Sequence, residues 1–479
     1  MPGEVPGPSG EEEQKVIGQE AGDTLPTKRR RFLKVVLGGT GAAGLSVLGY
    51  YLTKYGMQFF SDPQDTDYLE GTPVTRKTFP SAVRTSVPND ENTPPPPSST
   101  STPAATLNKT VTPTTFDEAM ATPAVEVREL SQEQKDFFFG QFLADYDVFK
   151  ERHTRIIFDG ERQVYFNDDG DISMESQVFG ELFAHFAQDD EAFHQLTKLD
   201  RNYIDERGLA PWLIYAKGGE DETVVTGVMM SMAWVRLQRP EPEYQEEGRK
   251  ILEGIKEFSI DKQYLIPKPF HWEGFDGTAN PASPSPLFLE DFAKVDPYWA
   301  EVAANTRGLM DKIGNQIEEG SLASFPTLVD MAEGKPAYDA DLGEPHIDYD
   351  IAYTTLNQLM GLLYCEDEAA RKNAREQLIL LDRFYYGKIA RQEDNGDTTY
   401  DIEGLKDGYL LNGEIDESET RYSRTAWTMA AAAASLTSED SEYRKFMLDE
   451  VLPNLPTSYS FNQYIHTFTN LVLSGRMKD

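Results

Sequence analysis

Asp171-Ile-Ser-Met-Glu-Ser-Gln-Val-Phe-Gly-Glu181 is the stretch that decides the fold. It follows an Asp/Gly turn at 167–170 and opens an apolar run over 178–186. The apolar residues recur at helical spacing, which predicts a helix with one buried face. That face comprises Val178, Phe179, Leu182, Phe183 and Phe186. Glu175 then lies in the first turn, where a carboxylate has an ordinary structural use, since it complements the positive end of the helix dipole.

Helical periodicity continues from this stretch to the end of the chain. Upstream, Ser131-Gln-Glu-Gln134 is a capping box that predicts an aromatic helix reaching about Lys150. Further helices are predicted over 176–188, 190–203, 222–237, 242–258, 297–317, 349–365, 367–386, 421–435, 438–451 and 461–473. Strand-like alternation is scarce, and no short repeat indicates an open solenoid. We therefore expect one all-α domain over 130–479, in which a closed ring of helical hairpins would bury the apolar stripes.

Residues 1–129 differ in composition from this helical region. The sequence predicts a disordered tail over 1–27 and a Pro/Ser/Thr-rich linker, or stalk, over 55–129. Between them, Arg29 and Arg30 precede an uncharged apolar run, which is typical of a twin-arginine export signal. A plain membrane anchor fits as well, because the run is just long enough to span a bilayer. We expect 28–54 to direct export, to the extracellular space or to the outer face of the cytoplasmic membrane.

The charge balance excludes one large class of partner. The chain has 81 acidic and 45 basic residues and a formal net charge of −36, which disfavours binding to nucleic acid. Such a surface also suits a halophilic protein, because salt screens its self-repulsion. The single cysteine, Cys365, rules out an intramolecular disulfide. The histidines and the cysteine do not have the spacing of a zinc motif. The sequence also contains no phosphate-binding loop and no serine-nucleophile elbow, so we expect no metal and no cofactor.

Carboxylates at predicted helix starts are the candidates for chemistry. Glu220-Asp-Glu222 and Asp348-Tyr-Asp350 precede predicted helices, as Glu175 does. In a helical ring the N-termini of the inner helices gather at one mouth, so the three sites would line one cleft. The alternative is that each is a helix cap, which we favour for Asp221 and Glu222. Carboxylates with abundant aromatic residues are typical of polysaccharide hydrolysis.

A series of short motifs runs through the chain from about 135 to 479. They are Phe158-Asp-Gly-Glu-Arg162, Met174-Glu-Ser-Gln-Val-Phe-Gly180, Asp189-Asp-Glu-Ala-Phe193, Gly208-Leu-Ala-Pro-Trp212, Asn280-Pro-Ala-Ser-Pro, Tyr349-Asp-Ile-Ala-Tyr353 and Leu473-Ser-Gly-Arg476. In their residues and their order these motifs resemble glycoside hydrolase family 8, whose members include endoglucanases, xylanases, chitosanases and lichenases.

The resemblance implies an (α/α)6 barrel and hydrolysis of a β-1,4-linked polysaccharide with inversion. Glu175 would be the general acid and Asp350 the general base, and inversion requires the two carboxyls to stand roughly 6.5–9.5 Å apart. Partial burial beside Phe179 would raise the pKa of Glu175 enough to hold a proton. The substrate-binding positions implied are Asp221, Glu222, Trp212, Tyr349, Tyr353 and Tyr459. Trp212 would be a stacking platform, with a place in the core as the alternative, and Tyr459 would position the water.

Departures from the family pattern define the alternatives. Ser176 replaces a glycine, Phe179 replaces a tyrosine, and Tyr353 replaces an arginine that would orient Asp350. Because both carboxylates are retained, we expect a monomeric, exported, endoglucanase-like glycosidase acting on a cellulose-like glucan. One alternative is a catalytically weak barrel that binds polysaccharide at the cell surface. Another is a polysaccharide lyase on the same fold.

Overall fold

The computed structural model describes residues 128–478 except 158–159, 165–170, 216–219, 222, 272, 338–345, 349, 394–396, 407, 417–422 and 456–459. The expected tail, the export segment and nearly all of the linker lie outside the described residues. So do three expected site residues, Glu222, Tyr349 and Tyr459. None of the described helices combines the length and the apolar character needed to cross a bilayer.

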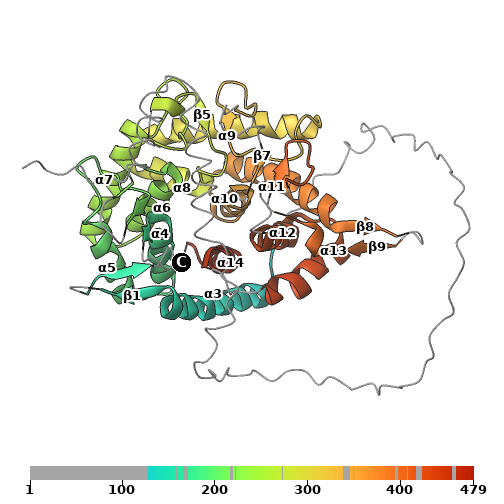
Figure 1. Cartoon of the computed structure of the whole chain (residues 1–479), viewed down its shortest axis with the longest axis horizontal. Helices are drawn as coiled ribbons and strands as arrows, with labels where there is room; N and C mark the ends of the chain where they lie inside the picture. The colour runs from blue at the N-terminus through green and yellow to red at the C-terminus, as the bar shows by residue number, and fades with distance from the viewer. Residues whose placement is uncertain are drawn as a thin grey trace, which may run out of the picture.

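Among the described residues, six inner helices form a closed ring (Figure 1). They are α4 (Met174–Phe186), α6 (Thr226–Leu237), α8 (Pro286–Val295), α10 (Asp350–Tyr364), α12 (Ser423–Thr437) and α14 (Ser460–Leu473). Each contacts the next, and α14 contacts α4, which closes the ring. In α4 and α10 most positions are buried, polar ones included. A helix covered all round in this way belongs inside a larger helical assembly.

In the described part of the chain, six outer helices surround the ring, and each packs on an inner helix. They are α3 (Gln132–Arg152), α5 (Asp190–Asp200), α7 (Pro242–Phe258), α9 (Tyr298–Glu318), α11 (Glu368–Ile389) and α13 (Ser441–Phe446). Helix α3 packs on α14, and α5, α7, α9, α11 and α13 pack on α4, α6, α8, α10 and α12, in that order. Helix α13 continues as η6 (Met447–Val451) and η7 (Leu452–Asn454). The structure is therefore an (α/α)6 barrel, which confirms the expected fold.

Short antiparallel strand pairs fix where several inner helices begin. The pairs are β1 (Thr154–Ile156) with β2 (Arg162–Val164), β3 (Ile172–Ser173) with β4 (Leu213–Ile214), β5 (Thr278–Ala279) with β6 (Val329–Asp330), β7 (His346–Ile347) with β10 (Tyr409–Leu410), and β8 (Ala390–Gln392) with β9 (Thr398–Tyr400). Strand β3 leads directly into α4, and β5 and β7 precede α8 and α10 by a few residues. Because each of these strands is paired, the chain enters each helix from a fixed position.

The inner helix α8 was missed by the sequence analysis. Prolines at 281, 284 and 286 interrupt the helical pattern, but Pro286 occupies the first turn, where its missing N–H costs nothing. The residues that follow it are buried in the core, namely Leu287, Phe288, Leu289 and Phe292. The remaining predicted helices are present, with ends displaced by a few residues. The capping box is also confirmed, since the side chains of Ser131 and Gln134 each accept a backbone N–H from the other residue.

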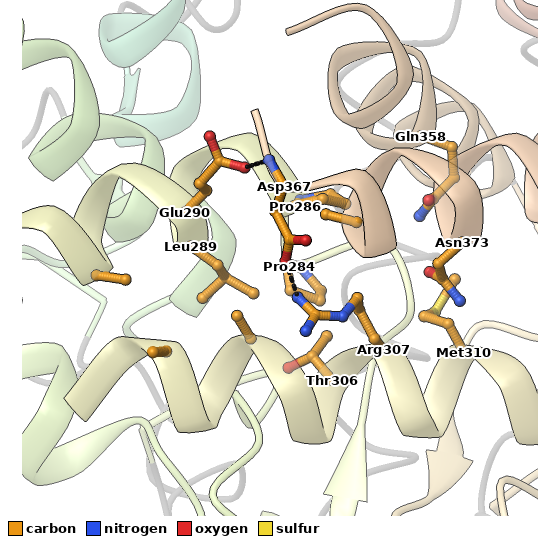
Figure 2. A pocket seen from close by; sticks show the side chains of 14 residues that line it. Pro284, Pro286, Leu289, Glu290, Thr306, Arg307, Met310, Gln358, Asp367 and Asn373 are labelled. Atoms are coloured by element: carbon orange, nitrogen blue, oxygen red, sulfur yellow. Dashed lines mark hydrogen bonds and ion pairs between the residues drawn. The ribbon is translucent and has the colours of Figure 1, made fainter. Parts of the chain in front are cut away.

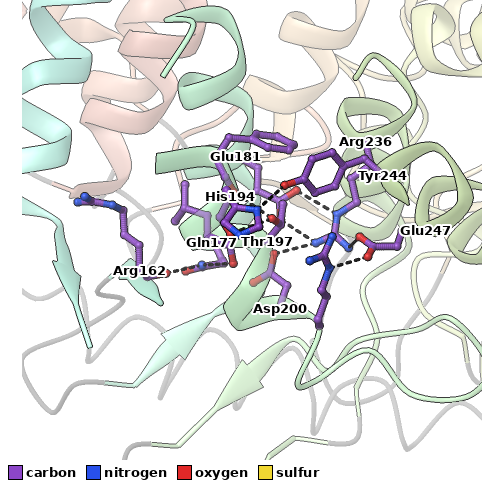
Figure 3. Close-up of polar contacts among 12 residues, drawn as sticks. Arg162, Gln177, Glu181, His194, Thr197, Asp200, Arg236, Tyr244 and Glu247 are labelled. Carbon is purple, nitrogen blue, oxygen red and sulfur yellow. Dashed lines mark hydrogen bonds and ion pairs between the residues drawn. The ribbon is translucent and has the colours of Figure 1, made fainter. Parts of the chain in front are cut away.

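A buried ion cluster ties α4 to its neighbours α5, α6 and α7 (Figure 3). Arg236 on α6 donates to Glu181 on α4 at 2.7 Å and to Asp200 on α5 at 3.1 Å. It also donates to Glu247 on α7 at 3.3 Å. The side chains of Arg236, Glu181 and Asp200 are fully buried. Burial, followed by the charge of Glu181, holds the pKa of Asp200 well above its usual range.

Gln177 anchors the first turn of α4 by three hydrogen bonds. Its Oε1 accepts from the backbone N–H of Val164 at 2.9 Å, and its Nε2 donates to the carbonyls of Arg162 and Leu196. Gln177 is completely buried, so its amide satisfies backbone groups that would otherwise lack partners. This glutamine belongs to the stretch that decides the fold, and it fixes α4 against β2 and α5.

Candidate active site

Glu175 lies in the first turn of α4, as the sequence predicts. Ser173 caps the helix, and its hydroxyl accepts from the backbone N–H of Ser176 at 3.4 Å. The N–H of Met174 donates to the carbonyl of Trp212 at 2.8 Å, so the β4 segment lies directly beside this turn. The Glu175 side chain is partly buried. The Ser173 cap and the bond to the Trp212 carbonyl together fix the backbone that carries Glu175.

Tyr353 reaches Glu175 from another inner helix. Its hydroxyl donates to Oε1 of Glu175 at 2.5 Å. Tyr353 lies on α10, and three helix steps around the ring separate α10 from α4, so this bond crosses the barrel. The Tyr353 ring also stacks on Phe179 of α4, with centroids 6.5 Å apart and planes 19° apart. We expected the loss of an arginine at this position to affect Asp350, but Tyr353 is bonded to the other carboxyl.

Asp350 is the first residue of α10 and is partly buried. The side-chain N–H of Asn280 donates to its Oδ2 at 2.7 Å. The Asn280 Oδ1 accepts from the backbone N–H of Ala282 at 2.8 Å, which turns the amide nitrogen toward Asp350. On α10, Asn357 donates to the Ala282 carbonyl at 2.7 Å and so holds the same loop. Asn280 therefore replaces the expected arginine as the partner that orients Asp350.

A second carboxylate lies beside Asp350 at the start of α10. Asp348 Oδ1 accepts the backbone N–H of Asp350, the first residue of α10, at 2.8 Å, so within this acidic patch Asp348 is the carboxylate that bonds the helix start. His346 Nε2 lies 3.7 Å from the other oxygen of Asp348. The side chain of Asp350 instead accepts its hydrogen bond from Asn280.

The pKa values of both candidate carboxyls are raised. Burial raises the pKa of Glu175, and the hydrogen bond from Tyr353 partly offsets this effect. Burial also raises the pKa of Asp350 well above its usual range, and the charges of Asp348 and Glu175 add to it, while Asn280 and His346 oppose it. Because the charge of Glu175 is one of the causes of this shift, the ionisation of Asp350 depends on that of Glu175.

Asp221 and Trp212 lie on the segment that flanks α4. We expected a helix from Glu222 with Asp221 at its cap, but α6 begins at Thr226 and its cap residue is Val225. The cap interpretation of Asp221 is therefore wrong, and its carboxylate accepts the backbone N–H of Thr223 at 2.7 Å. Trp212 is partly buried, and its backbone N–H donates to the Thr223 carbonyl at 2.7 Å. Among the hydrogen bonds of the described residues, none joins Asp221 to Glu175 or Asp350.

Two residues at this mouth were missed as site residues. Asn280 opens the quoted Asn-Pro motif, which was the available signal. Tyr464 on α14 hydrogen-bonds Ser176, and its ring lies 5.8 Å from that of Phe179. Burial raises the pKa of Tyr464, Ser176 lowers it, and Glu175 raises it further. The only sequence signal for this contact was the serine at position 176, where the family has a glycine.

No metal-binding arrangement adds to this site. Among the described residues, no group of three or more His, Cys, Asp or Glu side chains could hold a metal ion. A separate cavity of about 170 Å³ lies between α8, α9, α10 and α11 (Figure 2). Its walls include Gln358 and an ion pair of Arg307 with Asp367 at 3.3 Å, and exclude Glu175 and Asp350. This cavity is therefore separate from the two candidate carboxyls.

Solved structures share this fold. A β-1,3-1,4-glucanase from Paenibacillus sp. X4 is 18% identical with a TM-score of 0.61, and the match covers 74% of this chain and 95% of that chain. Rex8A from Paenibacillus barcinonensis, complexed with xylose, is 16% identical with a TM-score of 0.59, covering 76% and 98%. A cold-adapted family 8 xylanase is 17% identical with a TM-score of 0.59, covering 74% and 95%.

At these identities the comparisons show the fold. No family model matches the chain, and no curated protein matches its sequence. The chain has the (α/α)6 barrel of family 8 glycosidases, as the motif resemblance implied.

Proposed function

We propose that the chain is a divergent member of glycoside hydrolase family 8, an exported enzyme that hydrolyses a β-1,4-linked polysaccharide with inversion. One observation carries the proposal. Glu175 and Asp350 occupy the first turns of two inner helices on opposite sides of the ring, and Tyr353, one turn after Asp350, bonds to Glu175. Side chains at i and i+3 share a helix face, so the Asp350 carboxyl lies on the side of α10 that faces Glu175, whose charge acts on it.

The reaction assigns one task to each carboxyl. Glu175 gives its proton to the glycosidic oxygen as the bond from that oxygen to the anomeric carbon breaks. Asp350 takes a proton from a water molecule, whose oxygen bonds to the anomeric carbon from the opposite face. The product therefore has the inverted configuration. The amide of Asn280 favours Asp350 as the carboxylate, because a hydrogen bond donated to the charged form stabilises it.

The substrate class follows the family and the fold neighbours. We propose a cellulose-like glucan as the first candidate, by analogy with the family's endoglucanases. Xylan belongs in the same test, since the neighbours include a xylanase and Rex8A structures with xylose or an arabinofuranosyl-xylotetraose. Trp212, beside the first turn of α4, is proposed to stack on a sugar ring.

The location of the enzyme is part of the proposal. The paired arginines Arg29 and Arg30 ahead of an apolar run support export by the twin-arginine route, with the barrel released or anchored on the outer face of the membrane. The net charge of −36 supports work in concentrated salt. A monomer is proposed.

Release of reducing ends from polysaccharides tests the activity. The full-length chain is incubated with carboxymethyl-cellulose, lichenan, xylan and chitosan in low and high salt, beside Glu175→Gln. We expect release from at least one polymer, loss of that release in the variant, and an α-anomer as the first product by NMR.

Other outcomes identify the alternatives. Binding to a polymer without release, by a chain that is folded by circular dichroism, would replace the proposal with a polysaccharide-binding barrel. An unsaturated product that absorbs in the ultraviolet would indicate a lyase. A β-anomer as first product would refute inversion.

A further inference from the structure

The hydrogen bond between Tyr353 and Glu175 has a consequence for how the acid works. A phenol has one hydrogen to donate, and the Tyr353 hydroxyl directs it to Oε1 of Glu175 at 2.5 Å. With Oε1 occupied as an acceptor, the proton of the carboxylic acid resides on Oε2. The proton that can be transferred therefore has a fixed location before substrate binds.

We propose that Tyr353 is the positioning residue of the general acid, because it assigns the transferable proton to Oε2 of Glu175 and stabilises the carboxylate that remains after transfer. This inference rests on the proposed glycosidase function. It concerns an interaction that the resemblance did not imply, since the family has an arginine at this position, which would orient the base and not the acid.

The surroundings of Tyr353 make this contact rigid. Its ring stacks on Phe179, which lies one turn after Glu175 and therefore on the same face of α4. The Phe179 ring is in turn packed against Tyr464 and Phe468 of α14. One helix thus presents both the carboxyl and the surface that holds the tyrosine ring, so the hydroxyl is aligned without help from substrate.

The contact also becomes stronger as the reaction proceeds. When Glu175 gives up its proton from Oε2, negative charge develops on the carboxylate. A hydroxyl that donates to a carboxylate forms a shorter and stronger bond than one that donates to a neutral acid. Tyr353 therefore stabilises the transition state more than the ground state, which is the condition for raising kcat.

A neutral partner suits an acid that must remain protonated. A cation beside Glu175 would favour its ionised form and lower its pKa strongly, whereas a phenol lowers it less. Among the described residues, α10 brings Tyr353 and Asp350 to Glu175, and α14 brings Tyr464. Each of these groups is neutral or acidic. The exchange of arginine for tyrosine thus leaves Glu175 a proton donor, while the basic group His346 lowers the pKa of Asp350.

The test is Tyr353→Phe, which keeps the stacked ring and removes the hydroxyl. We expect kcat to fall about 10- to 100-fold, since a hydrogen bond to a charged group is lost, with KM nearly unchanged. The alkaline limb of the kcat/KM profile, which reports the acid in its protonated form, should move to higher pH. Tyr353→Arg should move the same limb to lower pH.

A matched control removes another buried tyrosine hydroxyl from the same region. Tyr385 pairs with Thr355 of α10 at 2.8 Å and makes no described contact with Glu175. Tyr385→Phe should therefore keep the pH profile of the unmodified protein. Thermal melting of all variants checks that each is folded.

Two results would overturn the inference. One is an unchanged kcat and pH profile in Tyr353→Phe, and the other is a loss confined to KM, which would make Tyr353 a substrate contact. If the unmodified protein hydrolyses nothing, the proposed function fails by itself. The inference is then tested by following the side-chain ¹³C signal of Glu175 with pH. If the pKa of Glu175 obtained from this signal is not higher in Tyr353→Phe than in the unmodified protein, the inference is overturned.

Discussion

Asp382 provides a quantitative test of how burial acts on a carboxyl in this barrel. It lies on α11, its side chain is 7% exposed, and its Oδ1 has no hydrogen-bond partner among the described residues. Burial raises the pKa of Asp382 from 3.8 to about 7, although Arg383 and a hydrogen bond with Thr437 oppose the rise. The carboxyl is therefore protonated in the folded barrel at mildly acidic pH.

The sign of the pH dependence follows from this raised pKa. Between the unfolded and folded pKa values the folded state binds more protons, so the free energy of unfolding falls as pH rises. The difference between 3.8 and about 7, at about 1.4 kcal/mol per pKa unit, corresponds to about 4 kcal/mol. Stability attributable to this group is complete below pH 3.8 and is lost as pH rises through about 7.

Asp382→Asn removes the ionisation while keeping the shape of the side chain. We expect the variant to resemble the unmodified protein at about pH 4 and to be more stable by about 2–4 kcal/mol at about pH 8. Urea denaturation at the two pH values measures the difference. Asp449→Asn, which removes a charge from an exposed position, serves as control and should change stability little at either pH. An equal effect of Asp382→Asn at both pH values would refute the reasoning.

Two further substitutions test the anchoring of α4. Arg236→Met should cost about 3–5 kcal/mol in urea denaturation, because Glu181 and Asp200 remain buried without their cation; a cost below about 1 kcal/mol would show that the cluster relaxes. Gln177→Leu should cost about 2–3 kcal/mol, since the N–H of Val164 loses its acceptor in a buried position, and should also lower kcat by displacing the turn that carries Glu175. Normal activity in a destabilised Gln177→Leu variant would show that this glutamine supports the fold without positioning the acid.

Local signals explain what the sequence could predict. The capping box at Ser131 and the start of α4 at Glu175 were predictable, because caps and apolar spacing act over a few residues. Helix α8 escaped prediction because the prolines at 281, 284 and 286 are typical of a loop, although the last of them fits the first turn of a helix. The cap assigned to Asp221 failed for a related reason, since an Asp that binds the N–H two residues later also occurs in isolated turns.

Sequence periodicity could not predict the contacts that cross the ring. Tyr353 and Glu175 are 178 positions apart, and no periodicity links them. The motif resemblance placed both residues at the site but implied a different partner for Asp350. Asn280 supplies that partner from the position directly after β5, a strand of two residues that alternation could not reveal.

The closed ring has a consequence for the timing of biosynthesis. Helix α14 lies between α3 and α4, and His153 at the end of α3 hydrogen-bonds Gln463, 310 positions later. The apolar faces of α3 and α4 therefore stay uncovered on the ribosome until nearly the whole barrel has been translated. At about 5–20 residues per second this interval lasts tens of seconds. A stop codon near position 460, at the start of α14, would leave a nascent chain in which α3 and α4 remain uncovered, and such chains are candidates for chaperone capture and degradation.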